Sequence, residues 1–296
     1  MADIYDGKLT TVTLNAMRVQ NALFLDIDHE YPENSTYNEH LGILAERLPE
    51  PRERSCLRYI GLGNAGHRPG NGPNGITIPK PVRHRATDSG AYNAIPWILR
   101  PVENDLSDDV RQNYALRRME THANRRYWAY YLKRIDNRGI RTRDYKITVE
   151  EGKQTTLDFK YSEQDNRPTP PELPSHDYNV DDKVAMQDGE YVLSNADLDV
   201  RMDEFDAQEF QNVARVLYGD PDFAIISELF LLTGVDAMAE GDAVDGSPFQ
   251  YEEAIGTQIA YHMTCFNNIA ITNDRLTYKF KIGQSVPFFL GAPASR

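Results

Sequence analysis

The sequence feature that most constrains the fold is the segment YWAYYLKRI at residues 127–135. Successive residues of a strand point in opposite directions, so this segment would place aromatic side chains on both faces of a strand. We expect a strand that is covered on both sides or that lies in a subunit interface. Interleaved basic and aromatic residues also suit single-stranded nucleic acid. The whole chain carries a net charge of −13, which would repel a polyanion, so we expect no specific nucleic-acid partner.

This segment ends a dense structural stretch that begins at Ala91. Residues 91–100 read as an apolar strand, which Pro96 places at a sheet edge or at a bulge. Ser107, followed by two aspartates, is typical of a helix N-cap with acids in the first turn. The pattern predicts a helix from there to about Arg118, followed by the aromatic strand.

Charge is distributed unevenly along the chain. Residues 111–146 contain eleven Lys and Arg against three acidic residues, and residues 172–253 contain twenty-one acidic residues against three basic ones. Blocks of opposite sign favour association, within one copy or between the basic face of one copy and the acidic face of another. Each block could equally be a solvated surface.

A glycine motif follows the strand predicted at 56–60. Gly61, Gly63 and Gly66 have the G-x-G-x-x-G spacing of dinucleotide-binding sites. Such a site needs a helix to open at the motif, whereas here prolines and glycines continue to Gly75. We therefore predict a long glycine-rich surface loop that could become ordered against a neighbour. The four basic residues after it are expected to be solvated: Lys80, Arg83, His84 and Arg85.

The other elements are predicted from shorter patterns. Residues 14–23 are read as an arm or a first short helix, after which Phe24, Leu25 and Ile27 could continue as a strand. A short helix is expected near 39–48 within a polar segment that should be mostly loop, and a longer one at 203–218, where apolar residues recur at helical spacing. Residues 223–232 form a near-continuous apolar run and predict a central strand, followed by a long acidic loop at 236–253. Three hairpins are expected. Their strands are 146–150 with 155–161, 183–186 with 190–193, and 256–266 with 275–282.

These elements predict a mainly β fold with β-sandwich-like sheets and a few peripheral helices, with α+β as the second choice. Four prolines at 168–174 indicate a linker or an excursion at 166–175. We expect an N-terminal β-rich domain at 1–165 and a C-terminal β-rich domain at 176–296, although one domain is also consistent with the length.

No pattern of catalytic or metal-binding residues stands out. The seven histidines show no metal-binding spacing, no nucleophile elbow is present, and Cys56 and Cys265 belong to no C-x-x-C pair. The two cysteines are expected to be buried free thiols, with a disulfide between them as the alternative that the sequence leaves open. Asp236, Glu240, Asp242 and Asp245 could offer oxygen ligands to calcium, but their spacing is not that of an EF-hand. We predict no enzyme, no cofactor and no metal, and no catalytic or binding residue is assigned.

The sequence also lacks membrane and secretion signals. No apolar run reaches 18 residues, and the first ten residues lack the pattern of a secretory signal. We expect no membrane partner and synthesis in a reducing compartment such as a cytoplasm.

Several phrases together resemble structural proteins of tailed bacteriophage virions, of the tail, baseplate or neck class. These phrases are DGKLTTVTLNAMRVQNALFLDID, AYNAIPWILRPVENDLSDDVRQNYALRR, YWAYYLKRID, AIISELFLLTGVDA, EAIGTQIAYHMTCF and FKIGQSVPFFL. The resemblance implies a non-enzymatic, β-rich virion component, made in the host cytoplasm, that forms a symmetric ring or wedge of identical subunits with other virion proteins. It transfers no functional residues.

Two other functions stay open at this point. Seventeen tyrosines with Trp97 and Trp128 would also suit a carbohydrate- or receptor-binding β-sandwich. The forty-five acidic residues leave room for a glycoside hydrolase or lyase with paired carboxylates.

Overall fold

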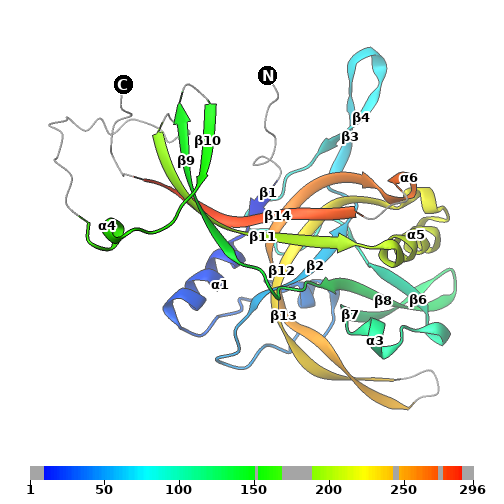
Figure 1. Cartoon of the computed structure of the whole chain (residues 1–296). Helices are drawn as coiled ribbons and strands as arrows, with labels where there is room; N and C mark the ends of the chain where they lie inside the picture. Colours follow the sequence, from blue (N-terminus) through cyan, green and yellow to red (C-terminus); the bar gives the residue numbers. More distant parts are fainter. Residues whose placement is uncertain (1–9, 151–152, 169–188, 243–246, 273–275, 289–296) are drawn as a thin grey trace. The chain divides into compact units, whose positions relative to one another are not determined.

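The computed structural model describes residues 10–150, 153–168, 189–242, 247–272 and 276–288 (Figure 1). The fold is mainly β, with antiparallel sheets and a few short helices, which confirms the predicted class. The chain forms two compact units, one from residues 1–136 and 202–276 and the other from residues 137–201 and 277–296. Each unit therefore combines two separate stretches of chain. The predicted 166–175 boundary stays a prediction, and it lies partly outside the described residues. No helix within these ranges is both long and apolar enough to cross a bilayer.

The first unit is built on an eight-stranded sheet with the order β1-β13-β12-β2-β8-β6, in which β5 also pairs with β2 and β7 with β8. Its strands are β1 (Thr10–Val12), β2 (Cys56–Gly63), β5 (Ala94–Ile95), β6 (Ile98–Pro101), β7 (Tyr114–His122), β8 (Arg125–Arg134), β12 (Ile225–Asp242) and β13 (Pro248–Asn268). The longest ladder joins β12 to β13, from Ile225 opposite Asn268 to Asp242 opposite Pro248. The sheet's core lies around the middle of β12, where residues 229–232 are fully buried.

Three helices of this unit begin at residues whose side chains cap the backbone. Thr13 caps α1 (Leu14–Leu25) and Thr36 caps α2 (Tyr37–Leu41). Asp203 caps α5 (Glu204–Tyr218) through a capping box with Asp206, and Gly219 ends this helix with φ 81°. The predicted helix at 203–218 is confirmed, and α1 covers the one considered near 14–23. The helix predicted near 39–48 overlaps α2 only at residues 39–41, because Gly42 ends α2 with φ 66°. Shorter helical turns are α3 (Asp108–Arg111), α6 (Ile269–Thr272), η1 (Pro73–Gly75), η2 (Val102–Asn104) and η3 (Pro221–Phe223).

The glycine-rich segment is a β-hairpin and not a loop, so that prediction was wrong. Strands β3 (His67–Asn71) and β4 (Thr77–Pro81) pair antiparallel around η1, with Asn71 opposite Thr77. Pro69 and Pro79 lie opposite each other in the middle of this ladder and Pro81 lies at its open end; they are tolerated because both strands are edge strands of a two-stranded sheet. In Figure 1 the two strands extend away from the eight-stranded sheet.

The central stretch confirms one prediction and corrects another. β8 carries aromatic residues on both faces, and Tyr127, Tyr130 and Tyr131 are all buried. The predicted helix to Arg118 is wrong, because α3 ends at Arg111 and the chain continues as β7. Residues 114–122 form a strand because their backbone pairs with β8. Local sequence patterns do not reveal this pairing.

Two further predictions fail near the end of the chain. Residues 236–253 are not a loop, because β12 runs to Asp242 and β13 begins at Pro248. Within this ladder the side chains of Glu240 and Glu252 are exposed and that of Asp236 is half-buried, whereas Glu253 is fully buried. The hairpin predicted for 256–266 with 275–282 does not form, since β13 pairs with β12 and β1, whereas β14 (Leu276–Pro287) belongs to another sheet.

The second unit contains a four-stranded antiparallel sheet with the order β10-β9-β11-β14. The predicted hairpin of β9 (Thr142–Glu150) with β10 (Lys153–Asp158) is confirmed. β11 (Gly189–Met202) pairs with β9, and α4 (Glu163–Asn166) follows β10. Side chains alternate along β14, where Tyr278 is buried between exposed neighbours. The first strand of the predicted hairpin 183–186 lies outside the described residues.

Candidate functional site

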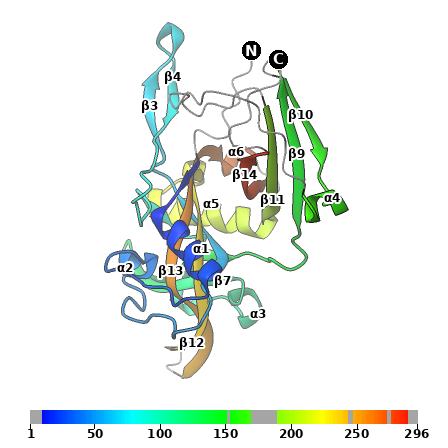
Figure 2. The same ribbon diagram turned by 90° about the vertical axis from the view of Figure 1, so that its left-hand side faces the viewer.

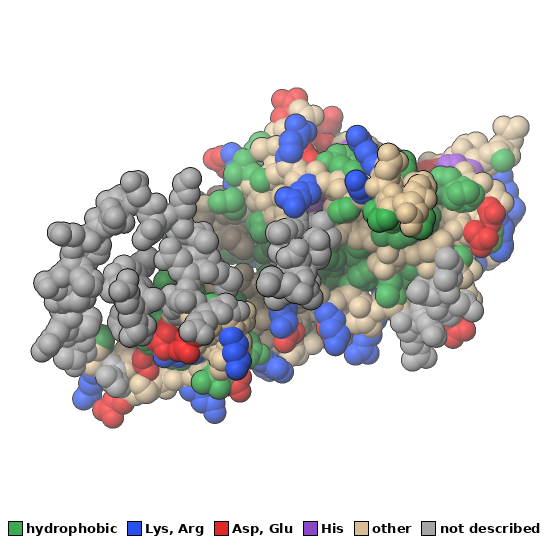
Figure 3. All heavy atoms as spheres, turned by 90° about the horizontal axis from the view of Figure 1, so that it is seen from above, with side chains coloured by type: hydrophobic (Ala, Val, Ile, Leu, Met, Phe, Trp, Pro, Cys, Tyr) green, Lys and Arg blue, Asp and Glu red, His purple; other side chains and the backbone are tan. Residues whose placement is uncertain are grey.

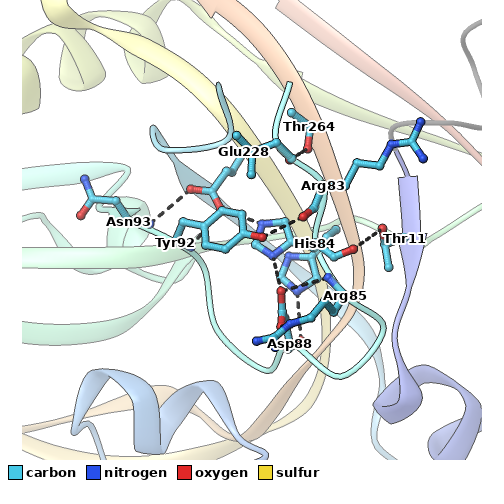
Figure 4. Close-up of polar contacts among 11 residues, drawn as sticks. Thr11, Arg83, His84, Arg85, Asp88, Tyr92, Asn93, Glu228 and Thr264 are labelled. Atoms are coloured by element: carbon cyan, nitrogen blue, oxygen red, sulfur yellow. Dashed lines mark hydrogen bonds and ion pairs between the residues drawn. The ribbon is translucent and has the colours of Figure 1, made fainter. Parts of the chain in front are cut away.

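A cluster of potentially catalytic side chains lies around Glu228 in the first unit and also contains His84, Asp88, Tyr92 and His262; Glu228 and the two histidines are buried, Asp88 is half-buried and Tyr92 is exposed. β12 supplies Glu228, β13 supplies His262, and the segment between β4 and β5 supplies the other three. Figure 4 shows that the segment folds over Glu228: the ring of His84 points towards the Glu228 carboxylate, whereas the Tyr92 hydroxyl points away from it and donates to the backbone oxygen of Arg83. Residues distant in sequence thus meet at one point of the sheet.

Both ring nitrogens of His84 face carboxylates. Nε2 lies 2.8 Å from Oε1 of Glu228, and Nδ1 lies 3.2 Å from Oδ2 of Asp88. The Glu228 carboxylate also accepts hydrogen bonds from three backbone N–H groups, those of Ala65 (3.2 Å), Tyr92 (3.0 Å) and Asn93 (3.3 Å). A buried carboxylate with this many donors is fully satisfied inside the protein.

Stacked rings complete the cluster. The ring of His84 lies between Tyr92 at 4.1 Å and His262 at 3.8 Å, measured between centroids, and the planes are nearly parallel. His262 Nε2 lies 3.1 Å from the backbone oxygen of Asp88. The stack holds the segment between β4 and β5 against β13.

Burial and hydrogen bonding shift the pKa values of the cluster. Burial would raise the pKa of Glu228, but hydrogen bonds from His84 and the three N–H groups lower it below its usual value. The pKa of Asp88 is lowered in the same way, by bonds from Arg85 and His84 that outweigh burial. Burial, and then the neighbouring His84, lower the pKa of His262 to about 4. The carboxylates are therefore charged and His262 is neutral at pH 7.

A histidine between two carboxylates has the composition of an acid–base site. Here, however, His84, Glu228 and His262 are each at most 7% exposed. Ser227, the residue before Glu228, accepts a hydrogen bond from the N–H of Gly66 at 2.9 Å. This arrangement anchors the segment between β4 and β5 to the sheet. It also corrects the prediction that His84 is solvated.

Glycines of the G-x-G-x-x-G motif have a packing role beside the same strand. A Cβ at Gly61 would overlap the ring of Phe230, and one at Gly63 would overlap the Glu228 carboxylate. At Gly66 it would overlap the backbone oxygen of Ser227. The three glycines thus let β2 and the following turn approach β12 closely.

Tyrosine–carboxylate clusters form a second group of polar contacts, around β7 and β8. In each cluster a tyrosine hydroxyl donates to a carboxylate that also binds an arginine or lysine. The members are Tyr130 and Arg117 with Asp105, Tyr131 and Arg118 with Glu120, Tyr114 and Lys133 with Asp206, and Tyr59 and Arg134 with Asp236. Burial, and then the adjacent carboxylate, raise the pKa of each hydroxyl, so the tyrosines remain donors at neutral pH.

These contacts decide how the basic and acidic blocks meet. Lys133 pairs with Asp206 and Arg134 with Asp236 within one copy. Glu253 accepts hydrogen bonds from the backbone N–H groups of Leu116 (2.6 Å) and Arg117 (2.9 Å), which joins β13 to β7. Part of the charge asymmetry is therefore neutralised inside the first unit.

Both tryptophans are part of this packed region. Trp97 is completely buried, and its indole N–H donates to the backbone oxygen of Ile60. Trp128 is half-buried under the guanidinium of Arg117, which lies 3.4 Å from its ring centroid. Neither ring is an open stacking platform.

The profile of a family of unknown function, DUF7208, matches residues 1–295. The chain belongs to this family. Neither the curated proteins nor the solved structures gave a match.

The acidic residues and cysteines considered as metal ligands from the sequence do not form a metal site within the described residues. Among the described residues, no group of three or more His, Cys, Asp or Glu side chains could hold a metal ion. Of the four acids considered for calcium, Asp236 is bound to Tyr59 and Arg134, and Asp245 lies outside the described residues. Cys56 and Cys265 are free thiols as predicted, but each is half-buried, and burial raises the pKa of Cys265 to about 12.

Large apolar side chains remain exposed outside these clusters. They include Met17, Phe24 and Leu25 on α1, Ile76 and Ile78 at the β3–β4 hairpin, and Met238 on β12. In the view of Figure 3, hydrophobic side chains are interspersed with charged side chains of both signs.

Proposed function

We propose that this protein is a structural component of a tailed-phage virion, in the tail, baseplate or neck, and that it assembles through subunit interfaces. The observation that carries the proposal is that polar side chains of this chain bind one another within one copy, whereas large apolar side chains are left on its surface. Tyrosine and basic residues of the central stretch bind acidic residues inside one copy, while large apolar side chains stay exposed on α1 and on the β3–β4 hairpin.

The projecting elements support the proposal. A hairpin that pairs only with itself, such as β3–β4, is better ordered when it lies against a neighbouring subunit. In the second unit, all six residues of the edge strand β10 are exposed, so its outer edge can receive a strand from another chain. Head-to-tail contacts of this kind close into rings when the rotation between subunits permits.

Mass spectrometry of virions purified from the phage that encodes the chain tests the proposal. We expect the chain in intact particles, at a constant ratio to the tail or neck proteins, and we expect a deletion mutant to produce incomplete particles. A chain that is abundant in the infected cell but lacking from purified virions would overturn the proposal.

The tyrosine and tryptophan content gives no comparable support to carbohydrate binding. The four tyrosines in the clusters use their hydroxyl groups on carboxylates, and both tryptophans are covered. A structural role, in which these aromatic side chains stabilise the fold, explains their burial better than carbohydrate binding does.

A further inference from the structure

Helix α1 has two apolar faces, and only one of them is used within the described structure. Ala16, Val19 and Ala22 are buried, and α1 lies against β13 on the side that faces the viewer in Figure 2. The opposite face carries larger side chains, Leu14, Met17, Phe24 and Leu25, all exposed, and Phe24 is 89% exposed.

The exposed residues follow the spacing of a helix–helix seam. Residues 14, 17, 21 and 24 alternate steps of three and four, which brings them into one line along the helix. Leu25 lies beside Phe24, and the exposed Asn21 stands in the middle of the line. We call these five residues, Leu14, Met17, Asn21, Phe24 and Leu25, the α1 seam.

We propose that the α1 seam binds the α1 seam of a second copy of this chain, antiparallel, with the two-fold axis near Asn21. About this axis Met17 of one copy meets Phe24 and Leu25 of the other, and all three side chains are exposed in the single copy. The two Asn21 side chains face each other and can exchange amide hydrogen bonds. A single asparagine in an apolar seam fixes the register of paired helices in this way, and a self-complementary patch is what a two-fold interface requires.

Charge favours the antiparallel arrangement over a parallel one. The first turn of α1 contains no acidic residue and its last turn no basic residue, so the helix dipole is not compensated by its own side chains. Asp26 and Asp28 follow the C-terminal end, and Asp26 is paired with Arg54. In an antiparallel pair Asp28 of each copy lies beside the positive N-terminal end of the other helix.

The size of the seam predicts a weak dimer. Five side chains on a helix of about 18 Å can bury only several hundred Å² per copy, below the area of a typical stable interface. We therefore expect association that depends on concentration. The inference goes beyond the proposed function, since the pair forms or fails in the purified protein whether or not the chain enters a virion.

Sedimentation equilibrium of the full chain over a hundredfold concentration range tests the pairing. We expect the wild type to shift from monomer towards dimer and the Met17→Glu variant to remain monomeric. Met238→Glu is the matched control, because Met238 is 51% exposed and Met17 54%, and Met238 lies on β12. It should associate like the wild type. A wild type that is monomeric throughout, or an equal loss in both variants, would overturn the proposal.

Cysteine cross-linking tests the register. Under a mild copper(II) oxidant, Asn21→Cys should form a covalent dimer, because residue 21 lies next to its own copy at the axis. Leu14→Cys should not, since residue 14 is far from its counterpart in an antiparallel pair. The wild type shows the background from Cys56 and Cys265. Efficient cross-linking of Leu14→Cys would overturn the antiparallel arrangement.

Discussion

At the scale of single residues, the buried polar groups of this protein hold distant segments together. Glu228 is the single charged residue in the apolar run FAIISELFLL. Its carboxylate contacts His84 and accepts hydrogen bonds from three backbone N–H groups. Acidic residues are almost never fully buried unless they are paired. A lone glutamate in such a run therefore signals a buried partner, although it does not identify that partner.

Replacing Glu228 tests this role. Glu228→Gln places an amide N–H₂ group against hydrogen-bond donors, so at least one donor is left unsatisfied. We expect a loss of about 3 kcal/mol in the free energy of unfolding, measured with urea. The control Glu240→Gln changes an exposed glutamate on the same strand and should cost less than about 0.5 kcal/mol. Equal effects of the two substitutions would contradict the role of Glu228.

His262 predicts a dependence of stability on pH. Its pKa is about 4 in the folded chain and about 6.5 in an unfolded chain, so between these values the unfolded state binds more protons. Stability therefore falls as pH decreases from about 6.5 to 4, by on the order of 3 kcal/mol from this residue alone. His29 and His40 add to this slope, because their pKa values are also lowered in the folded chain. The pKa values of Glu228 and Asp88 are lowered too, so the stability that these carboxylates contribute is lost only at still lower pH, as they become protonated.

Urea unfolding at pH 7, 5.5 and 4.5 measures this contribution. His84, Asp88, Glu228 and Phe230 surround His262 and remain in the His262→Gln variant. We expect a clearly smaller loss of stability on acidification in the variant than in the wild type. An unchanged slope would show that the charge on His262 does not control it.

At the scale of elements, β12 organises the first unit because β2 and β13 pair along its two edges. Close approach of β2 depends on the glycines of the G-x-G-x-x-G motif. The cross-strand pair of Gly61 with Phe230 is the clearest case, because the aromatic ring occupies the space where a Cβ would lie.

A double-mutant cycle isolates this contact. Gly61→Ala alone should destabilise the protein by at least 1–3 kcal/mol, roughly the cost of overpacking a core. Phe230→Leu alone creates space and has its own cost. In the Phe230→Leu background, Gly61→Ala should cost clearly less than in the wild type, because the overlapping ring is gone. Additive effects in thermal or urea unfolding would contradict the packing role of Gly61.

At the scale of the whole molecule, the two units differ in how much they bury. The fully buried side chains Trp97, Tyr37, Tyr59, Phe210 and Phe230 all belong to the first unit. The second unit has a four-stranded sheet in which β10 is exposed along its whole length. Because buried apolar area is the main source of stability, the first unit should be the more stable one.

Two spectroscopic probes can separate the units. Both tryptophans of the chain lie in the first unit, so tryptophan fluorescence reports that unit, whereas far-ultraviolet circular dichroism reports both sheets. We expect part of the dichroism signal to change at lower urea concentration than the fluorescence. Coincident transitions would show that the chain unfolds as one cooperative unit.

The sequence by itself determined the elements whose signals are local. The helix at 204–218 has its N-cap, its apolar period and its terminal glycine within seventeen residues, and β8 and the β9–β10 hairpin have equally local patterns. Only the tertiary structure decided which strands pair and which polar residues are buried. β14 alternates as predicted yet pairs with β11, and His84 is buried because Glu228 and His262, more than 140 residues away, surround it. Local patterns report which face of an element is apolar and where it ends, whereas pairing and burial depend on residues that meet only when the chain folds.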